Sequence, residues 1–462
     1  MSSQASPTPR AVQAGPREVL ALAIPAFLAL VAEPLFLMVD AAVVGRLGVV
    51  PLAGLGTASS VLLTATGVFV FLAYGTTSVV ARQVGAGSRR GAIEVGTGGI
   101  WLAGALGIVA AVVLGVFSPQ LAGAFGSSPE AVDEAVTYLR VSAIGVPAML
   151  LVLATTGILR GLQDTTTPLV AAALGFGGNA VLSVVLVLGA GWGIAGAAWG
   201  TVIAQWGMAI GLITVVMGQG HRVGASMRPH IGRVVDAALD GAPLLVRTLA
   251  LRAIILLTVA VAAGFGDVPL AAYQVTTTIW SLLVFALDAL AIAGQALTGA
   301  SLGSGDARGA RAATAFMVRW GVWGGAGLGL ALLAVHRVLP ALFTDDPQVR
   351  SAIAAGLVVV ALAQPLSGYV FVIDGVLIGA GDGRWLAGSM VLVLLAYLPI
   401  VALARVLGDG HGSAWAVVTL WLAFSGFMLV RGAFMWWRFR GDAWAVTGAQ
   451  RPRGSVDRAA GE

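Results

Sequence analysis

The sequence predicts an all-α integral membrane protein with twelve transmembrane helices. We expect two six-helix bundles, related by a pseudo-two-fold axis along the membrane normal. Hydrophobic residues make up 58% of the 462 residues and charged residues only 10%, and the mean hydropathy is +0.94. Soluble domains rarely combine these values. Two further observations support this class, namely that apolar segments recur along the chain and that its two halves repeat each other.

Glycine, proline and charged residues divide the chain into twelve apolar segments. Each is long enough to cross a hydrocarbon core of about 30 Å at about 1.5 Å per helical residue. The first apolar run is too long for the core of a signal peptide and continues into further spans, so we expect no cleavage. The predicted spans lie near residues 18–45, 51–80, 92–117, 131–159, 168–189, 193–218, 237–264, 269–302, 311–337, 347–378, 385–407 and 411–437.

Arginine predicts the orientation of these spans. It is concentrated in the two tails and in the loops after even-numbered spans, for example at Arg82, Arg89, Arg222 and Arg308. By the positive-inside rule these segments face the cytoplasm. We therefore expect a multi-pass protein of the plasma (inner) membrane, whose N-terminal tail (1–17) and C-terminal tail (439–462) are both cytoplasmic.

An internal repeat defines the bundles. One constant shift along the chain, called the repeat shift below, pairs Pro25 with Pro243, Pro147 with Pro365, Gly157 with Gly375, Gly161 with Gly379 and Asp164 with Asp382. We expect an N-terminal bundle over 18–218, a cytoplasmic linker loop over 219–236 and a C-terminal bundle over 237–438. Because six spans is an even number, the copies share one orientation, as they do in secondary transporters with parallel repeats.

Composition excludes several kinds of chemistry. The chain has no cysteine, and its four histidines lie in or beside predicted loops, so we expect neither a metal site nor a cofactor. It also has no lysine, which excludes a P-loop. A membrane-embedded enzyme therefore remains only a remote alternative. The net charge of +5 comes mostly from arginines near membrane edges, which favours contact with membrane lipid rather than nucleic acid.

Carboxylates inside apolar spans are the strongest functional candidates, because each costs at least ~2.5–3.5 kcal/mol on insertion scales. Glu33 and Asp40 lie seven residues apart, two helical turns along one face of the first span. Burial of an unpaired carboxylate favours its protonated form, which suits a proton carrier. Pro25 and Pro34 make this helix able to kink. The alternative is that neighbouring hydroxyl groups merely satisfy these acids.

Other polar side chains could line a central cavity. Asn179 and Ser183 lie four residues apart on one face of the fifth span, and Gln295 lies in the eighth; hydrogen bonding between helices is the simpler interpretation of such groups. Asp288 lies at about the depth of Arg252, so an ion pair and a direct ligand role are equally supported. Asp374 is expected to be structural, with Arg247 as its candidate partner.

The repeat separates these acids from the shared fold. The repeat shift pairs Asp40 with Thr258 and Asp288 with Val70. Each half therefore has its own polar site, and neither acid is required by the repeated helices.

These residues together resemble a known family. Glu33-Pro34-Leu35, Val39-Asp40 and Val44-Gly45-Arg46-Leu47-Gly48 are similar to the first-helix signature of the DinF-like branch of multidrug and toxic compound extrusion (MATE) transporters. Four motifs of the second half are similar to the same branch, namely Arg247 to Leu251, Asp288 to Ala291, Gln295 to Leu297 and Asp374 to Gly379. The resemblance implies two bundles around a central cavity, and antiport of organic cations or drugs against protons or sodium. It also implies that Asp40 couples the cation, with Asn179 near it.

One position departs from that pattern. Some relatives carry an aspartate four residues after the asparagine, where this chain has Ser183. We therefore expect Asp40 to act alone or with Glu33, and protons to be favoured over sodium. The expected function is secondary active antiport of small organic cations by a monomer. The alternative is a flippase or exporter of a lipid-linked or anionic metabolite.

Overall fold

The computed structural model describes residues 15–124 and 128–450. Parts of the two predicted tails, residues 1–14 and 451–462, lie outside the described residues. Within the described ranges the structure contains helices and no strands. The chain divides into two compact units, one formed by residues 21–242 and the other by residues 243–450 together with residues 15–20.

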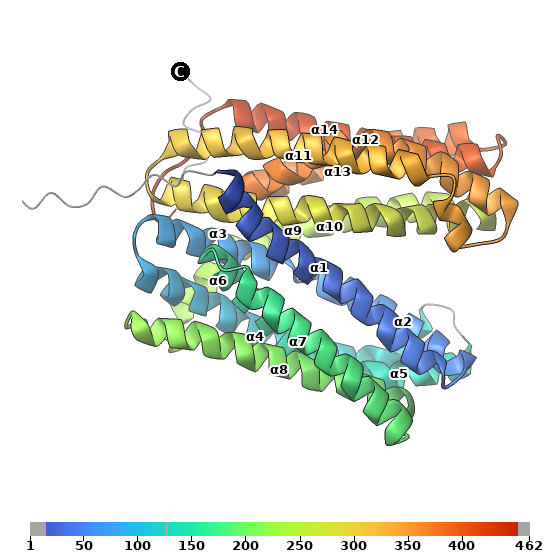
Figure 1. The fold of residues 1–462 in the computed structure, drawn as a ribbon, viewed down its shortest axis with the longest axis horizontal. Coiled ribbons are helices and arrows are strands. Elements are labelled where there is room, and N and C mark those ends of the chain that lie inside the picture. The colour runs from blue at the N-terminus through green and yellow to red at the C-terminus, as the bar shows by residue number, and fades with distance from the viewer. Residues whose placement is uncertain (1–14, 125–127, 451–462) are drawn as a thin grey trace, which may run out of the picture. The chain divides into compact units, whose positions relative to one another are not determined.

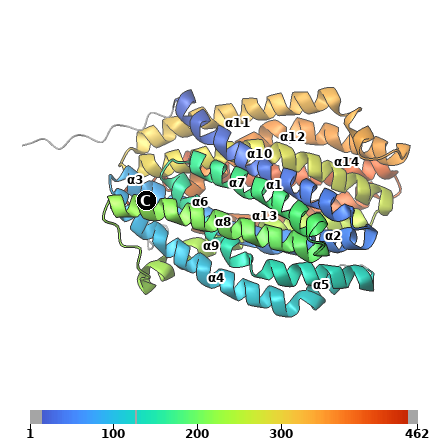
Figure 2. The same cartoon turned by 60° about the horizontal axis from the view of Figure 1, so that its bottom comes forward.

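The first unit holds the first helix from residue 21 onwards and the following helices up to the start of α9. Its second predicted span consists of α2 and α3, and its fourth consists of α5 and α6, which are bent by 52° at a short break. In Figures 1 and 2, α7 runs beside α8 and α4 runs beside α5. The elements are α1 (Pro16–Gly45), α2 (Val49–Val68), α3 (Phe71–Gly85), α4 (Arg89–Gly123), α5 (Pro129–Ala143), α6 (Val146–Gly161), α7 (Thr166–Ser183), the π-helix η1 (Val184–Gly189), α8 (Gly193–Arg222) and the beginning of α9 (Ile231–Ala263).

The second unit holds the remaining helices, among which α12 packs against α10, α11 and α14 (Figure 1). Its elements are the rest of α9, α10 (Asp267–Gly303), α11 (Ala307–Val335), the 3₁₀-helix η2 (Leu339–Leu342), α12 (Pro347–Gly379), α13 (Gly383–Gly408) and α14 (Ser413–Arg440). Over the described residues, 11 helices are long and apolar enough to span a membrane, and the bent pair α5 and α6 makes a possible twelfth. The all-helical membrane class is thus confirmed.

The turns repeat as the sequence repeats. Ser88 caps α4 by accepting a hydrogen bond from the backbone N–H of Gly91 at 3.0 Å, and Asp306 caps α11 in the same way from Gly309 at 2.7 Å. The repeat shift pairs these two caps. The glycines one residue before each cap, Gly87 and Gly305, have φ values of +81° and +85°. Glycine adopts this conformation without steric cost, so each copy begins its third span with the same turn.

Helix crossings repeat in the same register. A Cβ atom at Gly157 of α6 would lie 2.6 Å from the carbonyl oxygen of Ala73 on α3. At the equivalent place in the second unit, a Cβ atom at Gly375 of α12 would overlap the carbonyl oxygen of Ala291 on α10. The glycines therefore let backbones approach closely, as small residues do in membrane helices. The predicted repeat is confirmed at the level of backbone contact.

The predicted linker is mostly helical. Helix α8 extends to Arg222 and α9 begins at Ile231, so the connecting loop is shorter than predicted. Glu94 of α4 holds this loop by accepting hydrogen bonds from the backbone N–H of Ser226 at 3.2 Å and from Arg233 at 2.9 Å. Trp101 of α4 donates to the carbonyl of Met227 at 3.3 Å. The linker thus lies against α4 of the first unit.

Candidate functional site

Asp40 of α1 is the centre of a buried polar cluster, and only 2% of its surface is exposed. Its Oδ1 accepts a hydrogen bond from the Ser183 hydroxyl of α7 at 2.7 Å, and its Oδ2 accepts one from the Tyr138 hydroxyl of α5 at 3.3 Å. Asn179 of α7 lies 3.2 Å from the Ser183 hydroxyl and donates to Thr201 of α8 at 3.3 Å. Side chains from four helices therefore meet at one carboxylate.

Local structure explains why these groups meet. Asn179 and Ser183 are four residues apart and lie on one face of α7. The π-helix η1 begins directly after Ser183, and such segments are frequent at functional sites. Gly200 of α8 allows the close approach, because a Cβ atom there would lie 2.9 Å from Oδ1 of Asn179.

The single hydrogen of the Ser183 hydroxyl has two acceptors. When Asp40 is ionised, that hydrogen is directed to Oδ1 of Asp40, the shorter of the two contacts. When Asp40 is protonated, its own hydroxyl can donate to Ser183, and Ser183 can then donate to Oδ1 of Asn179. One bound proton can thus reverse the hydrogen bond between Asp40 and Ser183 and add one from Ser183 to Asn179.

The equivalent position in the second unit is neutral. The repeat shift pairs Asp40 with Thr258 of α9 and Asn179 with Tyr397 of α13. The hydroxyl oxygens of Thr258 and Tyr397 lie 2.6 Å apart. The same shift pairs Tyr138 with Gly356, beside which an aromatic ring of α14 packs. The carboxylate therefore belongs to the first bundle alone, as the sequence predicted from the asymmetry of the repeat.

The remaining first-helix candidates lie apart from this cluster. Glu33 is exposed, and within the described residues it joins none of the hydrogen bonds around Asp40. Both acids lie on α1, as predicted, but Asp40 is packed among side chains of α5 and α7 whereas Glu33 is not part of that cluster. Whether Glu33 acts with Asp40 stays a prediction. Pro25 and Pro34 lie inside α1, which remains helical through both positions.

Asp374 lies in a buried cluster of three charges in the second unit. Arg247 of α9 forms an ion pair with it, with a hydrogen bond of 3.2 Å from Nε of Arg247 to Oδ1 of Asp374. The predicted partner of Asp374 is thus confirmed. Arg431 of α14 adds a second ion pair at 2.8 Å, and only 4% of its side chain is exposed. Two guanidinium groups therefore share one carboxylate in this cluster.

The other predicted cavity residues lie in different environments. Arg252 of α9 is exposed, whereas Asp288 of α10 is half-buried. Gln295 is buried where α10 crosses α12, and a Cβ atom at Gly379 of α12 would overlap its backbone carbonyl. This crossing gives Gln295 a packing position.

Sequence reasoning missed three members of these clusters, namely Tyr138, Thr201 and Arg431. Arg431 lies inside the predicted last span, so an arginine at that depth was a usable signal. Tyr138 and Thr201 carry hydroxyl groups that are common in membrane helices, and only the packing of α5 and α8 on α7 brings them to the cluster.

Repeated bundles of membrane-spanning helices, with a carboxylate buried among neutral groups in one of them, are typical of a membrane transporter rather than an enzyme. Comparisons with known proteins agree. The MatE family model matches residues 25–185 and 243–403. These two blocks begin at Pro25 and Pro243, a pair that the repeat shift also matches. The chain belongs to the MatE family of multidrug and toxic compound extrusion transporters.

Individual relatives extend the comparison. The chain is 32% identical over 389 residues to Protein DETOXIFICATION 44, chloroplastic, of Arabidopsis thaliana, and the match covers 81% of this chain and 74% of that protein. The fold is similar to a MATE crystal structure in the bent conformation, with a TM-score of 0.83 at 20% identity over 92% of this chain and 95% of the other. For a MATE crystal structure in the straight conformation, the TM-score is 0.82 at 21% identity, and the match covers 94% of this chain and 99% of the other.

Proposed function

We propose that this transporter exports small organic cations in exchange for protons, by alternating access, and that Asp40 binds the coupling proton. The observation that carries the proposal is the burial of one carboxylate among neutral hydroxyl and amide groups. A charge in this position is costly, and one proton removes it. We also propose that the chain belongs to the DinF-like branch and acts as a monomer in the plasma (inner) membrane, with both termini in the cytoplasm.

The hydrogen-bond chain around Ser183 suggests how the proton acts. Protonation of Asp40 removes an acceptor for Ser183 and supplies a donor to it, so the partners of Asn179 change as well. A bound proton shifts a two-state equilibrium only if it binds one state more tightly. We propose that Asp40 holds its proton more tightly in the outward-open state, and that release towards the cytoplasm resets the transporter.

Helix α1 is the element that we propose to move. It carries Asp40 and contains Pro25 and Pro34, which remove backbone hydrogen bonds and allow bending. Its Phe36 stacks on Phe176 of α7 with ring centroids 5.3 Å apart, so a bend would change the packing of α1 on α7. The solved relatives named above are described as bent and straight conformations, which is consistent with a bending element.

Transport into proteoliposomes tests this proposal. Uptake or efflux of a fluorescent organic cation would be followed under an imposed proton gradient and, separately, under a sodium gradient. We expect proton-driven transport in the wild type and its loss in Asp40→Asn. Thr258→Val changes the repeat-equivalent position and is the matched control, for which we expect near-normal transport. Sodium-driven transport, or an intact proton response in Asp40→Asn, would contradict the proposal.

The arginines of the second unit favour a second candidate, export of an anionic metabolite. Arg247 and Arg431 bring two buried guanidinium groups together at Asp374, and guanidinium groups are suited to binding anions. The same proteoliposomes distinguish the two candidates if a panel of organic anions replaces the cation. Transport of anions that is lost in Arg431→Gln but retained in Asp40→Asn would favour this alternative.

A further inference from the structure

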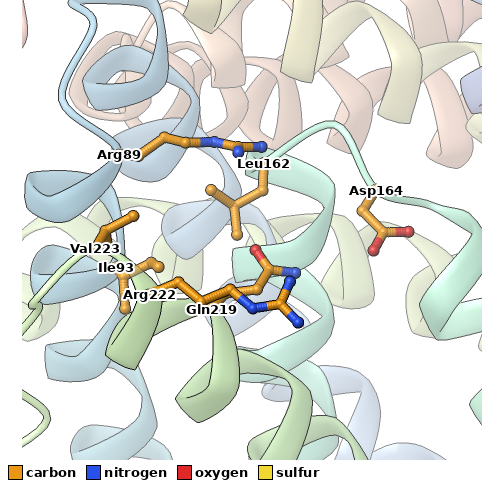
Figure 3. A pocket seen from close by; sticks show the side chains of 7 residues that line it. All are labelled: Arg89, Ile93, Leu162, Asp164, Gln219, Arg222 and Val223. Carbon is orange, nitrogen blue, oxygen red and sulfur yellow. The ribbon is translucent and has the colours of Figure 1, made fainter.

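A cavity of about 270 Å³ lies among helix ends of the first unit, and its lining differs from the cluster around Asp40. Figure 3 shows Arg89 at the start of α4, Gln219 and Arg222 at the end of α8, and Asp164 in the turn after α6. Arg89 and Arg222 are exposed, whereas Ile93 and Leu162 are buried. The cavity therefore combines a charged rim with an apolar floor.

The charged groups are suited to a ligand that carries both signs of charge. Two guanidinium groups are suited to binding a phosphate, because they offer several donors in a fixed plane. Asp164 supplies a carboxylate for a cation. Its orientation is set by the start of α7, since it accepts hydrogen bonds from the backbone N–H of Thr167 at 2.9 Å and from the Thr167 hydroxyl at 2.6 Å.

In the second unit, the acid equivalent to Asp164 is paired with a cationic side chain of the protein itself. Asp382, the repeat partner of Asp164, accepts two hydrogen bonds from Arg438 of α14, at 2.7 and 3.1 Å. The Arg438 guanidinium lies over the ring of Trp385, the repeat partner of Thr167. The repeat shift pairs Arg438 with Gly220, which has no side chain to reach Asp164.

From this comparison we propose that the cavity binds a phosphoethanolamine group, with the phosphate between Arg89 and Arg222 and the ammonium at Asp164. The ammonium would then take the role towards Asp164 that the Arg438 guanidinium has towards Asp382. The amide of Gln219 can donate to a phosphate oxygen. Such a group reaches the cavity as the headgroup of a phospholipid, because helix ends lie at the depth of the headgroups. The apolar floor would contact hydrocarbon parts of the lipid.

Lipid binding to the purified full-length protein tests the site. The detergent-solubilised transporter would be delipidated, and phosphatidylethanolamine, phosphatidylglycerol or phosphatidylcholine added back, with bound lipid counted by native mass spectrometry. We expect phosphatidylethanolamine to bind most tightly. Arg89→Gln and Arg222→Gln should each weaken its binding about fivefold, which corresponds to the loss of one arginine near an anionic headgroup.

Two further variants make the test specific. Arg228→Gln removes an exposed arginine of the linker that does not line the cavity, and it should leave binding unchanged. Asp164→Asn keeps an oxygen that can accept from Thr167 but removes the charge, so phosphatidylethanolamine should lose its advantage over phosphatidylglycerol. The proposal would be overturned if Arg228→Gln weakened phosphatidylethanolamine binding as much as Arg89→Gln does. It would also be overturned if neither Arg89→Gln nor Arg222→Gln weakened that binding.

The source of the group is tested separately with free phosphoethanolamine and with inorganic phosphate. Weak binding of both beside tight binding of the lipid supports a membrane lipid as the ligand. Free phosphoethanolamine that binds as tightly as the lipid, and depends on Arg89, Arg222 and Asp164, supports the same site with a soluble ligand. The role of the ammonium would be overturned if inorganic phosphate bound as tightly as the lipid or free phosphoethanolamine and Asp164→Asn left all binding unchanged.

Discussion

The hydroxyl oxygen of Ser183 lies 2.7 Å from Oδ1 of Asp40, so a neutral side chain of α7 stabilises the ionised carboxylate of α1. A hydrogen bond to a charged group contributes about 1.5–3 kcal/mol, and one pH unit corresponds to about 1.4 kcal/mol. In Ser183→Ala the ionised form loses this bond and protonation becomes easier. We therefore expect the pH of half-maximal transport to rise by about one unit.

The measurement is the pH dependence of proton-driven transport in proteoliposomes, with Ser118→Ala as the control. Ser118 is also buried, but it donates to the carbonyl of Gly115 within α4. An unchanged pH dependence in Ser183→Ala, or an equal shift in Ser118→Ala, would contradict the proposal that Asp40 binds the coupling proton.

Gly200 gives a steric test of the same cluster. In Gly200→Ala the new Cβ atom would lie 2.9 Å from Oδ1 of Asn179 and 3.1 Å from the backbone nitrogen of Ser183, so α7 and α8 must separate. We expect transport to fall strongly and the free energy of unfolding to fall by about 1–3 kcal/mol, as overpacking costs. Gly207→Ala is the control on the same helix, since nothing lies within 4 Å of a Cβ atom there. Transport and thermal unfolding of both variants should separate the two positions.

The charge cluster of the second unit predicts an order of stability. Asp374→Asn leaves Arg247 and Arg431 buried together without their shared carboxylate. Breaking a buried ion pair from one side costs about 3–5 kcal/mol. Arg431→Gln leaves a one-to-one pair of Arg247 with Asp374, so we expect it to unfold at a higher temperature than Asp374→Asn. Thermal unfolding in detergent measures this order, and the reverse order would show that the two ion pairs do not act as one cluster.

The attachment of the linker to α4 can be tested by hydrogen exchange. Glu94→Ala removes the acceptor of the Ser226 backbone N–H and the partner of Arg233. We expect amides of residues 223–230 to exchange about tenfold faster or more, because local opening loses two interactions. Arg90→Gln removes the other partner of Glu94 but leaves both linker contacts. In this variant the same amides should exchange at the wild-type rate. Mass spectrometry of peptides from this loop provides the comparison.

Much of the fold could be predicted because the membrane imposes it. Hydrophobic length set the spans, and the constant repeat shift identified the two copies that Gly157 and Gly375 then showed in their contacts. What escaped prediction depends on small distances. The break between α5 and α6 lies at Gly145, just before Pro147, and composition alone does not place a bend of 52° there.

The candidate site could be predicted in part for a related reason. Asp40 is conspicuous because a charge in an apolar span is costly, whereas Tyr138 and Thr201 are recognised only when helices distant in sequence are packed together. The separation of Glu33 from Asp40 shows the limit of helical spacing. Seven residues place two side chains on one face, but a neighbouring helix can cover one turn of that face and leave another exposed.

The repeated glycine contacts also bear on how such a protein can change. Gly157 and Gly375 contact main-chain carbonyls. The helix packing of each copy at these crossings therefore does not depend on the polar side chains elsewhere in its interior. After a duplication, one copy could therefore keep an acid beside hydroxyl groups while the other exchanged it for Thr258 and Tyr397, with neither change disturbing the helices. The two halves therefore share one helical scaffold but differ in the polar groups that it encloses.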